Sequence, residues 1–216
     1  LATGNPYIKE KMDLDIQVSK LKLMKANHTS QKYRLEDNIA KHYPQQITIL
    51  KERISGMQAD IQTAKANLPV DKEQFSMKVG DKLYTDKKEA GTALVEMCKE
   101  IKTVNAPAVI GEYAGFKMAV SFDAFNHKFV MNLKGQLSHN LEVGSLGNIS
   151  RINHALESMP KQLTEAQTKL ETVEHQLETA KVEVTKPFAQ EAELAEKLER
   201  LSALNALLNM DEKGND

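Results

Sequence analysis

Mostly apolar residues recur at alternating intervals of three and four along the last third of the chain. The positions of this seven-residue repeat are Ile149, Ile152, Leu156, Met159, Leu163, Ala166, Leu170, Val173, Leu177, Ala180, Val184, Pro187, Glu191, Leu194, Leu198, Leu201, Asn205 and Leu208. Such a repeat places the apolar side chains in one narrow stripe, which needs a second helix to cover it. The pattern therefore predicts one long helix over residues 149–208 that forms half of a coiled coil.

A second stripe runs through the first third of the chain, where we expect a helix to begin at Asn5. Asn is a favoured N-cap, and the proline that follows it loses no helical hydrogen bond at the first position. The stripe consists of Leu14, Val18, Leu21, Leu35, Ile39, Ile47, Leu50, Ile54, Met57, Ile61, Ala64 and Leu68. Ile39 and Tyr43 are four residues apart, and so are Tyr43 and Ile47. The repeat requires intervals of three and four, so this stretch contains one extra residue. Because Pro44 lacks an N–H and disfavours helix at Tyr43, we expect a kink or a short break there.

The two stripes fit an antiparallel pairing in which the numbers of contacting residues add up to 216–217. This register places Lys25 near Glu191, and His28 near Pro187 and Phe188. The part of the first stripe between Leu21 and Leu35, which has no apolar residues, thus faces the part of the second stripe that contains Pro187 and Glu191. A polar patch inside such a seam fixes the register at some cost in stability. Pro187 leaves two alternatives for the second helix, a kink or a break.

The charges of the two helical regions are opposite. Residues 1–67 contain 11 Lys and Arg against 7 Asp and Glu, whereas residues 149–216 contain 8 against 13. Self-pairing of the acidic helix in a homodimer would set like charges together. The charge distribution therefore favours a monomeric hairpin within one chain.

Between the two helices the apolar period changes to that of strands. Residues 75–84 predict a β-hairpin with a turn at Gly80-Asp81, and Asp86 can cap a helix that ends at about Lys102. Alternating apolar residues indicate four further strands at 109–113, 116–122, 128–134 and 137–143. Their alternation predicts an antiparallel meander with one buried face.

Together these patterns predict an α+β protein, built as a long antiparallel coiled-coil hairpin with a small domain inserted at its tip. The expected segments are a first coiled-coil arm (residues 1–68), an inserted domain with a β-meander and a helix (residues 69–148), and a second arm (residues 149–216). Charged residues make up 27% of the chain, aromatic residues only 5%, and Trp is absent. This composition fits long helices better than one large globular core.

The single cysteine, Cys98, excludes an intrachain disulfide framework and a cysteine-based metal cage. We therefore expect a reducing, cytoplasmic compartment. The sequence has no run of about 18 apolar residues and no secretory signal, so we expect no contact with a membrane. Because the chain begins with Leu1 rather than Met, we expect it to be a piece of a longer protein.

Motifs that carry catalysis are absent from the sequence. No GxxxxGK[ST] phosphate loop occurs, and the six histidines form no i,i+4 pair beside a carboxylate that could ligate a metal. Cys98 could act as a nucleophile only with a basic partner, and its place on a predicted helix favours a role in packing. We therefore expect no enzyme activity in this chain, no metal and no cofactor.

Basic residues indicate a possible contact with nucleic acid. In the first arm they crowd the stretch from residue 9 to residue 34, as Lys9, Lys11, Lys20, Lys22, Lys25, Lys32 and Arg34. In and beside the predicted meander the candidate binding residues are Lys117, Lys128, Lys134 and Arg151, which accompany Tyr113, Phe116 and Phe129. Lysines beside aromatic residues are typical of sheets on which nucleic-acid bases stack. In the alternative interpretation, the lysines pair with the acidic arm and the aromatic side chains belong to the core.

Short motifs spread over nearly the whole chain resemble one known group of proteins. They are LATGNPYIKEKMDLD at residues 1–15, VSKLK at 18–22, HYP at 42–44, RIS at 53–55, DKKEAG at 86–91, IGEYAGF at 110–116, LKG at 133–135, KPF at 186–188 and LNALLNMD at 204–211. The opening motif resembles the segment just after the motor in very large bacterial helicase-like proteins of the Swi/Snf type. Conjugative elements and phages typically carry these proteins, and some are fused to an adenine-specific DNA methyltransferase.

The resemblance implies a C-terminal accessory region of a DNA-dependent ATPase or helicase of a mobile element, with the upstream motor as a partner. The ATP-binding loop and the Asp-Glu box of that family match no position here. Two hypotheses follow. In the first, a non-catalytic accessory module positions the small β domain for contact with DNA or a partner. In the second, the chain is a scaffold or spacer that docks other proteins and never contacts nucleic acid.

Overall fold

The computed structural model describes residues 4–71, 73–101 and 106–214. Residues 1–3 of the opening motif and the expected helix end at Lys102 lie outside the described residues. The chain divides into two compact units. The helical unit comprises residues 1–46 and 173–216, and the sheet unit comprises residues 47–172.

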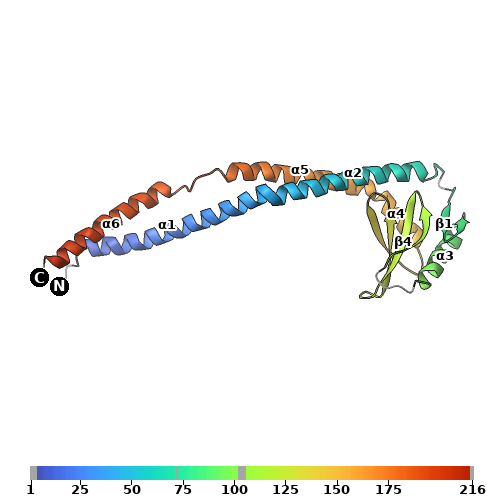
Figure 1. The fold of residues 1–216 in the computed structure, drawn as a ribbon, viewed down its shortest axis with the longest axis horizontal. Helices are drawn as coiled ribbons and strands as arrows, with labels where there is room; N and C mark the ends of the chain where they lie inside the picture. Colours follow the sequence, from blue (N-terminus) through green and yellow to red (C-terminus); the bar gives the residue numbers. More distant parts are fainter. Residues whose placement is uncertain (1–3, 72, 102–105, 215–216) are drawn as a thin grey trace. The chain divides into compact units, whose positions relative to one another are not determined.

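The helical unit is built from the ends of the chain. Its elements are α1 (Pro6–Asp37), the π-helical turn η1 (Asn38–His42), the first residues of α2 (Tyr43–Asn67), the last residues of α5 (Met159–Glu183) and α6 (Glu191–Lys213). The start of α1 is confirmed, because the Asn5 side chain accepts a hydrogen bond of 3.0 Å from the N–H of Tyr7. Figure 1 shows α1 and α6 lying side by side.

A small apolar cluster joins α1 to α6. Val18, Leu21 and Leu194 are buried in it, and Phe188 and Leu201 pack against them. Charged and polar pairs flank the cluster, because the long side chains at its edge reach across to the other helix. Two such pairs are Arg200 with Glu10, at 2.7 and 2.9 Å, and Lys197 with Gln17, at 2.5 Å. The hydrogen bonds from Arg200 lower the pKa of the Glu10 carboxyl.

The predicted neighbours in the polar stretch of the two helices are confirmed. Lys25 Nζ lies 2.7 Å from Glu191 Oε1. The ring centroids of His28 and Phe188 are 5.8 Å apart, and His28 Nε2 lies 3.1 Å from the carbonyl oxygen of Lys186. Within the helical unit, the antiparallel register inferred from the sequence is therefore correct at this point.

Helical residues continue without a gap from Pro6 to Asn67, so the helix does not break at Pro44, and a turn of π-helix lies directly before Tyr43. The N–H of Tyr43 donates to the carbonyl of Asn38, five residues earlier. A π-turn holds one residue more than an α-turn. It therefore absorbs the extra residue that the four-and-four spacing introduces, and the helix passes through proline without ending.

The expectation of one uninterrupted helix over residues 149–208 is wrong. The region forms three helices, α4 (Asn148–Glu157), α5 and α6, and residues 184–190 between α5 and α6 are not helical. Pro187 lies in this segment, lacks the N–H that a helix requires and disfavours helical geometry at Lys186. Of the two alternatives for Pro187, a kink or a break, the structure has the break.

Beyond this break the apolar stripe differs from the predicted one. Leu204 is fully buried, whereas the predicted seam residue Asn205 is exposed, and Leu198 is 37% exposed. Leu194 and Leu201, by contrast, lie at predicted seam positions and belong to the apolar cluster. The repeat counted through Pro187 therefore assigns the wrong residues to the seam in part of α6.

The sheet unit contains the rest of α2, then the strands and α3, and finally α4 with the start of α5. The elements between α2 and α4 are β1 (Met77–Val79), β2 (Lys82–Tyr84), α3 (Lys87–Lys99), β3 (Ala108–Tyr113), β4 (Phe116–Asp123), β5 (Lys128–Lys134) and β6 (Ser138–Val143). The strands form one sheet in the order β2-β1-β3-β4-β5-β6, with every neighbouring pair antiparallel. The protein is therefore of the α+β class, with a long helix and a six-stranded antiparallel sheet.

The predicted meander, the hairpin at Gly80-Asp81 and the helix cap at Asp86 are all confirmed. The Asp86 carboxylate accepts a hydrogen bond of 2.9 Å from the N–H of Glu89, in the first turn of α3. The first hairpin extends the meander, because β1 pairs with β3. Gly111 permits this pairing, since a Cβ there would overlap the carbonyl oxygen of Lys78 on β1.

One face of the sheet is buried under helices. Alternate residues of the strands point into this core: Met77, Val79, Tyr113, Phe116, Met118, Val120, Met131 and Leu133. Side chains of α2, α3 and α4 complete the same cluster, among them Met57, Ile61, Leu94, Cys98, Ile152 and Leu156. Since successive side chains of a strand point to opposite faces, the residues between these core positions lie on the other face.

A buried carboxylate ties the sheet to α2. Asp60 is 1% exposed and accepts hydrogen bonds from the N–H groups of Gln136 and Leu137, at 2.6 and 3.0 Å. His139 Nε2 lies 2.7 Å from the same carboxylate, and this ring is also buried. Gly135 allows the turn between β5 and β6 to come this close, because a Cβ there would overlap Asp60 Oδ1. A residue of α2 thus satisfies the buried donors of a turn far along the chain.

Replacing Asp60 tests the importance of this contact for stability. We expect Asp60→Ala to lower the free energy of unfolding by about 3 kcal/mol or more, since the buried ring of His139 and two partly buried backbone N–H groups lose their acceptor. Urea unfolding followed by circular dichroism measures the effect. Glu52→Ala, an exposed change on the same helix, should stay within about 0.5 kcal/mol of the wild type. Equal effects of the two changes would contradict the role given to Asp60.

Charge reversal tests the register of α1 and α6. Glu191→Lys should destabilise the helical unit at low salt, because it places two ammonium groups together at Lys25. The loss should be about 0.5–1 kcal/mol, as for exposed ion pairs. Adding Lys25→Glu should restore the melting temperature in a double-mutant cycle. Lys22→Glu, which has no partner on α6 among the described residues, should restore nothing. No coupling between positions 25 and 191 would contradict the register.

Candidate nucleic-acid interface

Two of the four candidate binding residues meet on the open face of the sheet. Lys117 on β4 and Lys134 on β5 are direct cross-strand partners, and both are exposed. Both alternate with buried residues, Lys117 between Phe116 and Met118 and Lys134 after Leu133, so they point away from the core. Neither lysine has an ion pair or hydrogen bond from its side chain to any residue that the structure describes.

The same cross-strand row continues toward the other edge of the sheet. Lys117 is paired on its other side with Glu112 of β3, which is paired in turn with Lys78 of β1. The four exposed side chains therefore carry charges in the order plus, minus, plus, plus. We call Lys78, Lys117 and Lys134 the lysine row. With strands about 4.8 Å apart, the row spans roughly 14 Å.

Sequence reasoning missed Lys78. It lies in a short strand between two buried residues, Met77 and Val79, so its outward direction could be read from the alternation. The alternation does not predict that β1 pairs with β3. This pairing brings Lys78 into one row with Lys117. That pairing is non-local, since α3 and a connecting segment separate the two strands along the chain.

The other two candidate residues lie elsewhere and have partners. Lys128 is at the opposite end of β5 from Lys134, and its ammonium lies 3.2 Å from both carboxylate oxygens of Glu142. Arg151 is on α4, and its Nη1 donates to the carbonyl of Leu146 at 2.8 Å and to Asn148 Oδ1 at 3.0 Å. The structure therefore does not bring Lys128 and Arg151 together with the lysine row.

The aromatic residues that accompanied the candidates are core residues, as in the alternative interpretation. Phe116 is fully buried, and Tyr113 is 7% exposed and donates a hydrogen bond of 2.7 Å to Asn153 Oδ1. Burial also raises the pKa of the Tyr113 hydroxyl. Phe129 packs against the core and lies 5.1 Å from Phe122 between ring centroids. Bases cannot stack on these rings beside the lysines, because strand alternation puts them on the opposite face.

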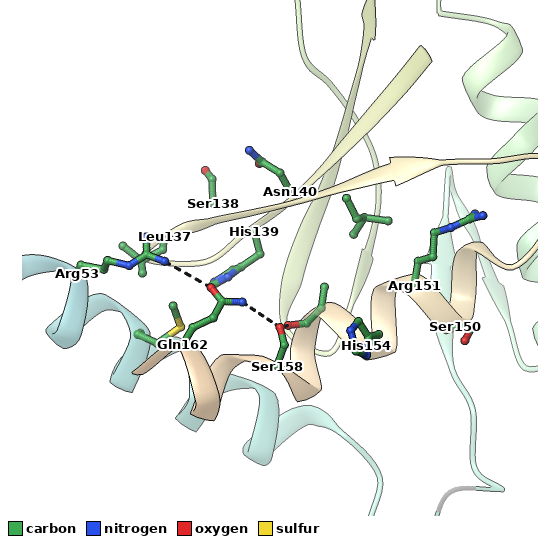
Figure 2. A pocket seen from close by; sticks show the side chains of 13 residues that line it. Arg53, Leu137, Ser138, His139, Asn140, Ser150, Arg151, His154, Ser158 and Gln162 are labelled. Atoms are coloured by element: carbon green, nitrogen blue, oxygen red, sulfur yellow. Dashed lines mark hydrogen bonds between the residues drawn. The ribbon is translucent and has the colours of Figure 1, made fainter. Parts of the chain in front are cut away.

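A second feature of the sheet unit is a cleft of about 560 Å³ beside β6. Its residues come from α2, from the turn and first half of β6, from α4 and from the start of α5: Arg53, Met57, Leu137, Ser138, His139, Asn140, Leu141, Ser150, Arg151, His154, Ala155, Ser158 and Gln162. In Figure 2 Arg53 donates to Gln162 Oε1, at 3.4 Å, and Gln162 donates to Ser158 Oγ, at 2.9 Å. The lining includes two arginines and no acidic residue.

Cys98 is not poised as a nucleophile, and the described residues include no metal-binding group. Cys98 is buried, and desolvation raises the pKa of its thiol to about 11, so the thiol stays protonated at neutral pH. Within the described part of the chain, no three His, Cys, Asp or Glu side chains converge on a point that could hold a metal ion. In the same part, no helix is both long and apolar enough to cross a membrane.

Comparison with known proteins finds no matching protein family, no similar curated protein and no similar solved structure.

Proposed function

We propose that this chain is a non-catalytic accessory region of a cytoplasmic helicase-like protein of the Swi/Snf type, and that the lysine row of its sheet contacts DNA. The resemblance of the short motifs supports the helicase context. The observation that carries the DNA contact is the direct cross-strand pairing of Lys117 with Lys134, both exposed and neither in an ion pair with a described residue.

Physical chemistry favours an external anion at this pair. Like charges directly opposite each other on neighbouring strands destabilise a sheet. Glu112 offsets part of this repulsion for Lys117 and Lys78, but the row keeps an excess of positive charge. Phosphate groups of nucleic acid would relieve the repulsion and release counterions. Because no aromatic ring of the core is available on this face, the contact would be with the backbone and independent of sequence.

We further propose that the two units belong to one coiled-coil hairpin that carries the sheet at its tip. Contacts within each unit support this arrangement separately. In the helical unit the numbers of Lys25 and Glu191 add up to 216, and in the sheet unit those of Arg53 and Gln162 add up to 215. Toward the chain ends the sum falls, to 214 for Gln17 with Lys197 and to 210 for Glu10 with Arg200, so the register is nearly constant only in the middle of the two arms. Helical residues from Pro6 to Asn67, at about 1.5 Å each, would form an arm of roughly 90 Å.

Small-angle X-ray scattering tests the hairpin. A rod of that length has a radius of gyration of at least about 25 Å, since a rod's radius of gyration is its length divided by √12. A compact chain of this size would have a radius of gyration of about 17 Å. We expect the larger value together with a monomeric mass by light scattering. A value near that of the compact chain, or a dimer, would contradict the proposal.

Fluorescence anisotropy of labelled DNA tests the lysine row. With single-stranded, duplex and forked DNA, binding should weaken as salt rises. Three phosphate contacts predict a loss of roughly 40-fold for duplex DNA between about 50 and 200 mM salt. The double variant Lys117→Glu and Lys134→Glu should abolish binding, because it reverses the charge at the centre of the row.

The chain offers two matched controls. Lys128→Glu should have a much smaller effect than either change in the row, since Glu142 already neutralises that ammonium. Lys65→Glu, an exposed change on α2, is combined with Lys128→Glu so that the net charge changes by the same amount as in the double variant of the row. Absence of binding at tens of micromolar protein, or equal losses in all variants, would contradict the DNA contact. It would favour the other hypothesis, a protein-docking scaffold without nucleic-acid contact.

A further inference from the structure

The cleft beside β6 lies at a free edge of the sheet. β6 is the last strand in the order β2-β1-β3-β4-β5-β6, and it pairs only with β5. In an antiparallel edge strand, every second residue turns its N–H and C=O away from the sheet. Residues 138–141 of β6 line the cleft, so part of this edge borders an open space that could accept a further strand.

A helix forms the opposite wall of the cleft. Ser150 and His154 of α4, Ser158 at the junction of the two helices and Gln162 of α5 line it and recur every four residues, so they lie along one side of this helical wall. In Figure 2 this side runs below Ser138 and Asn140 of β6. A groove between a strand edge and a helix is the geometry in which several domains bind an extended peptide as an added strand.

The cleft has apolar residues where it meets the core and two arginines at its border, and its other lining residues are polar. Leu137, Leu141 and Ala155 are partly buried hydrophobic residues that pack on the core beneath it. Arg53 and Arg151 are exposed at its border, and no Asp or Glu is among the residues that line it. An added strand alternates its side chains between two directions. The cleft therefore suits a strand with apolar residues toward the core and acidic residues toward the arginines.

We propose that the cleft between β6 and α4 binds an extended acidic segment of a partner protein, which adds to β6 as a seventh strand. Main-chain hydrogen bonds to the free edge would provide affinity, and the arginines would select for carboxylates. None of Lys78, Lys117 and Lys134 lines the cleft, but Lys134 is the cross-strand partner of Ser138, which does. The proposal does not depend on the contact with DNA, because it is argued from the strand edge and the arginines.

A peptide fits this cleft better than a nucleic acid does. An edge strand presents alternating donors and acceptors, whereas a phosphate backbone offers acceptors alone. The guanidinium of Arg151 is oriented by its bonds to Leu146 and Asn148, and that of Arg53 by its bond to Gln162. Oriented guanidinium groups match the planar geometry of a carboxylate, but they match phosphate as well, so the preference for a peptide comes from the strand edge.

Titration of the whole chain with labelled hexapeptides tests the proposal. The first probe alternates Glu and Val, the second replaces Glu by Lys, and the third repeats the first with every second backbone N–H methylated. We expect the first peptide to bind at least about tenfold more tightly than the second, because of the arginines. We expect the third to lose binding by a similar factor, because strand addition needs the main-chain donors.

Variants locate the site. Arg53→Glu should weaken binding of the acidic peptide by about tenfold or more, whereas Lys65→Glu on the same helix should leave it unchanged. Lys78→Glu, at the end of the lysine row farthest from β6, should also leave it unchanged, which separates this site from the lysine row. Because Arg151 bonds to the backbone near the start of α4, Arg151→Gln is tested together with a melting curve. NMR amide shifts at residues 138–142 would confirm the edge.

Four results would overturn the proposal. One is no binding of the acidic peptide up to about 1 mM. Another is equal binding of the methylated peptide, which would indicate charge attraction without strand addition. A third is that duplex DNA displaces the peptide completely and that Arg53→Glu abolishes the binding of this DNA. Such a result would make the cleft a nucleic-acid site. The last is amide shifts confined to residues outside β6 and α4.

Discussion

The Asp60 carboxylate, buried in the core of the sheet unit, accepts hydrogen bonds from two backbone N–H groups of the β5–β6 turn and from the ring of His139. A buried carboxylate is stable only when donors of this kind surround it, so the helix and the turn depend on each other. The contact also fixes which residues of β5 and β6 face the core. A shift of one residue in either strand would exchange its buried and exposed faces. Asp60 thereby holds Leu133 in the core and Lys134 outside.

Both candidate surfaces follow from this arrangement. The lysine row lies on the face that the alternation leaves open, with Lys134 directly before Gly135, where the turn meets Asp60. The cleft begins at the next residues, Leu137 to Leu141, which the same contact positions against α2. One sheet therefore presents a basic row on its face and an unpaired strand at its edge. These are two different means of recognition, charge in the first and main-chain pairing in the second.

Local features of the fold could be predicted from the sequence, and most non-local ones could not. Gly80-Asp81, the cap at Asp86 and the strand alternation are signals carried by a few neighbouring residues, and each was correct. The two prolines show that local sequence does not determine how a helix responds to proline. Pro44 and Pro187 have the same local chemistry, yet a π-turn carries the helix through Pro44, while the helix ends before Pro187.

The candidate site shows the same division. Alternation was enough to turn Lys117 and Lys134 outward, but only the register of β4 with β5 makes them neighbours. Phe116 stands next to Lys117 in the sequence and on the opposite face in the structure, so proximity along the chain was misleading for the aromatic residues. Asp60 gave no signal, because a single acid on a helix is usually exposed and its partners lie far along the chain.

The most direct test of the account is an NMR titration of the ¹⁵N-labelled chain with a short DNA duplex at low salt. The account predicts that amide shifts concentrate at Lys78, Lys117 and Lys134 and at the outward residues between them. Shifts confined to the lysines of α1, or the absence of any shift, would contradict the claim that the open face of the sheet is the surface that contacts DNA.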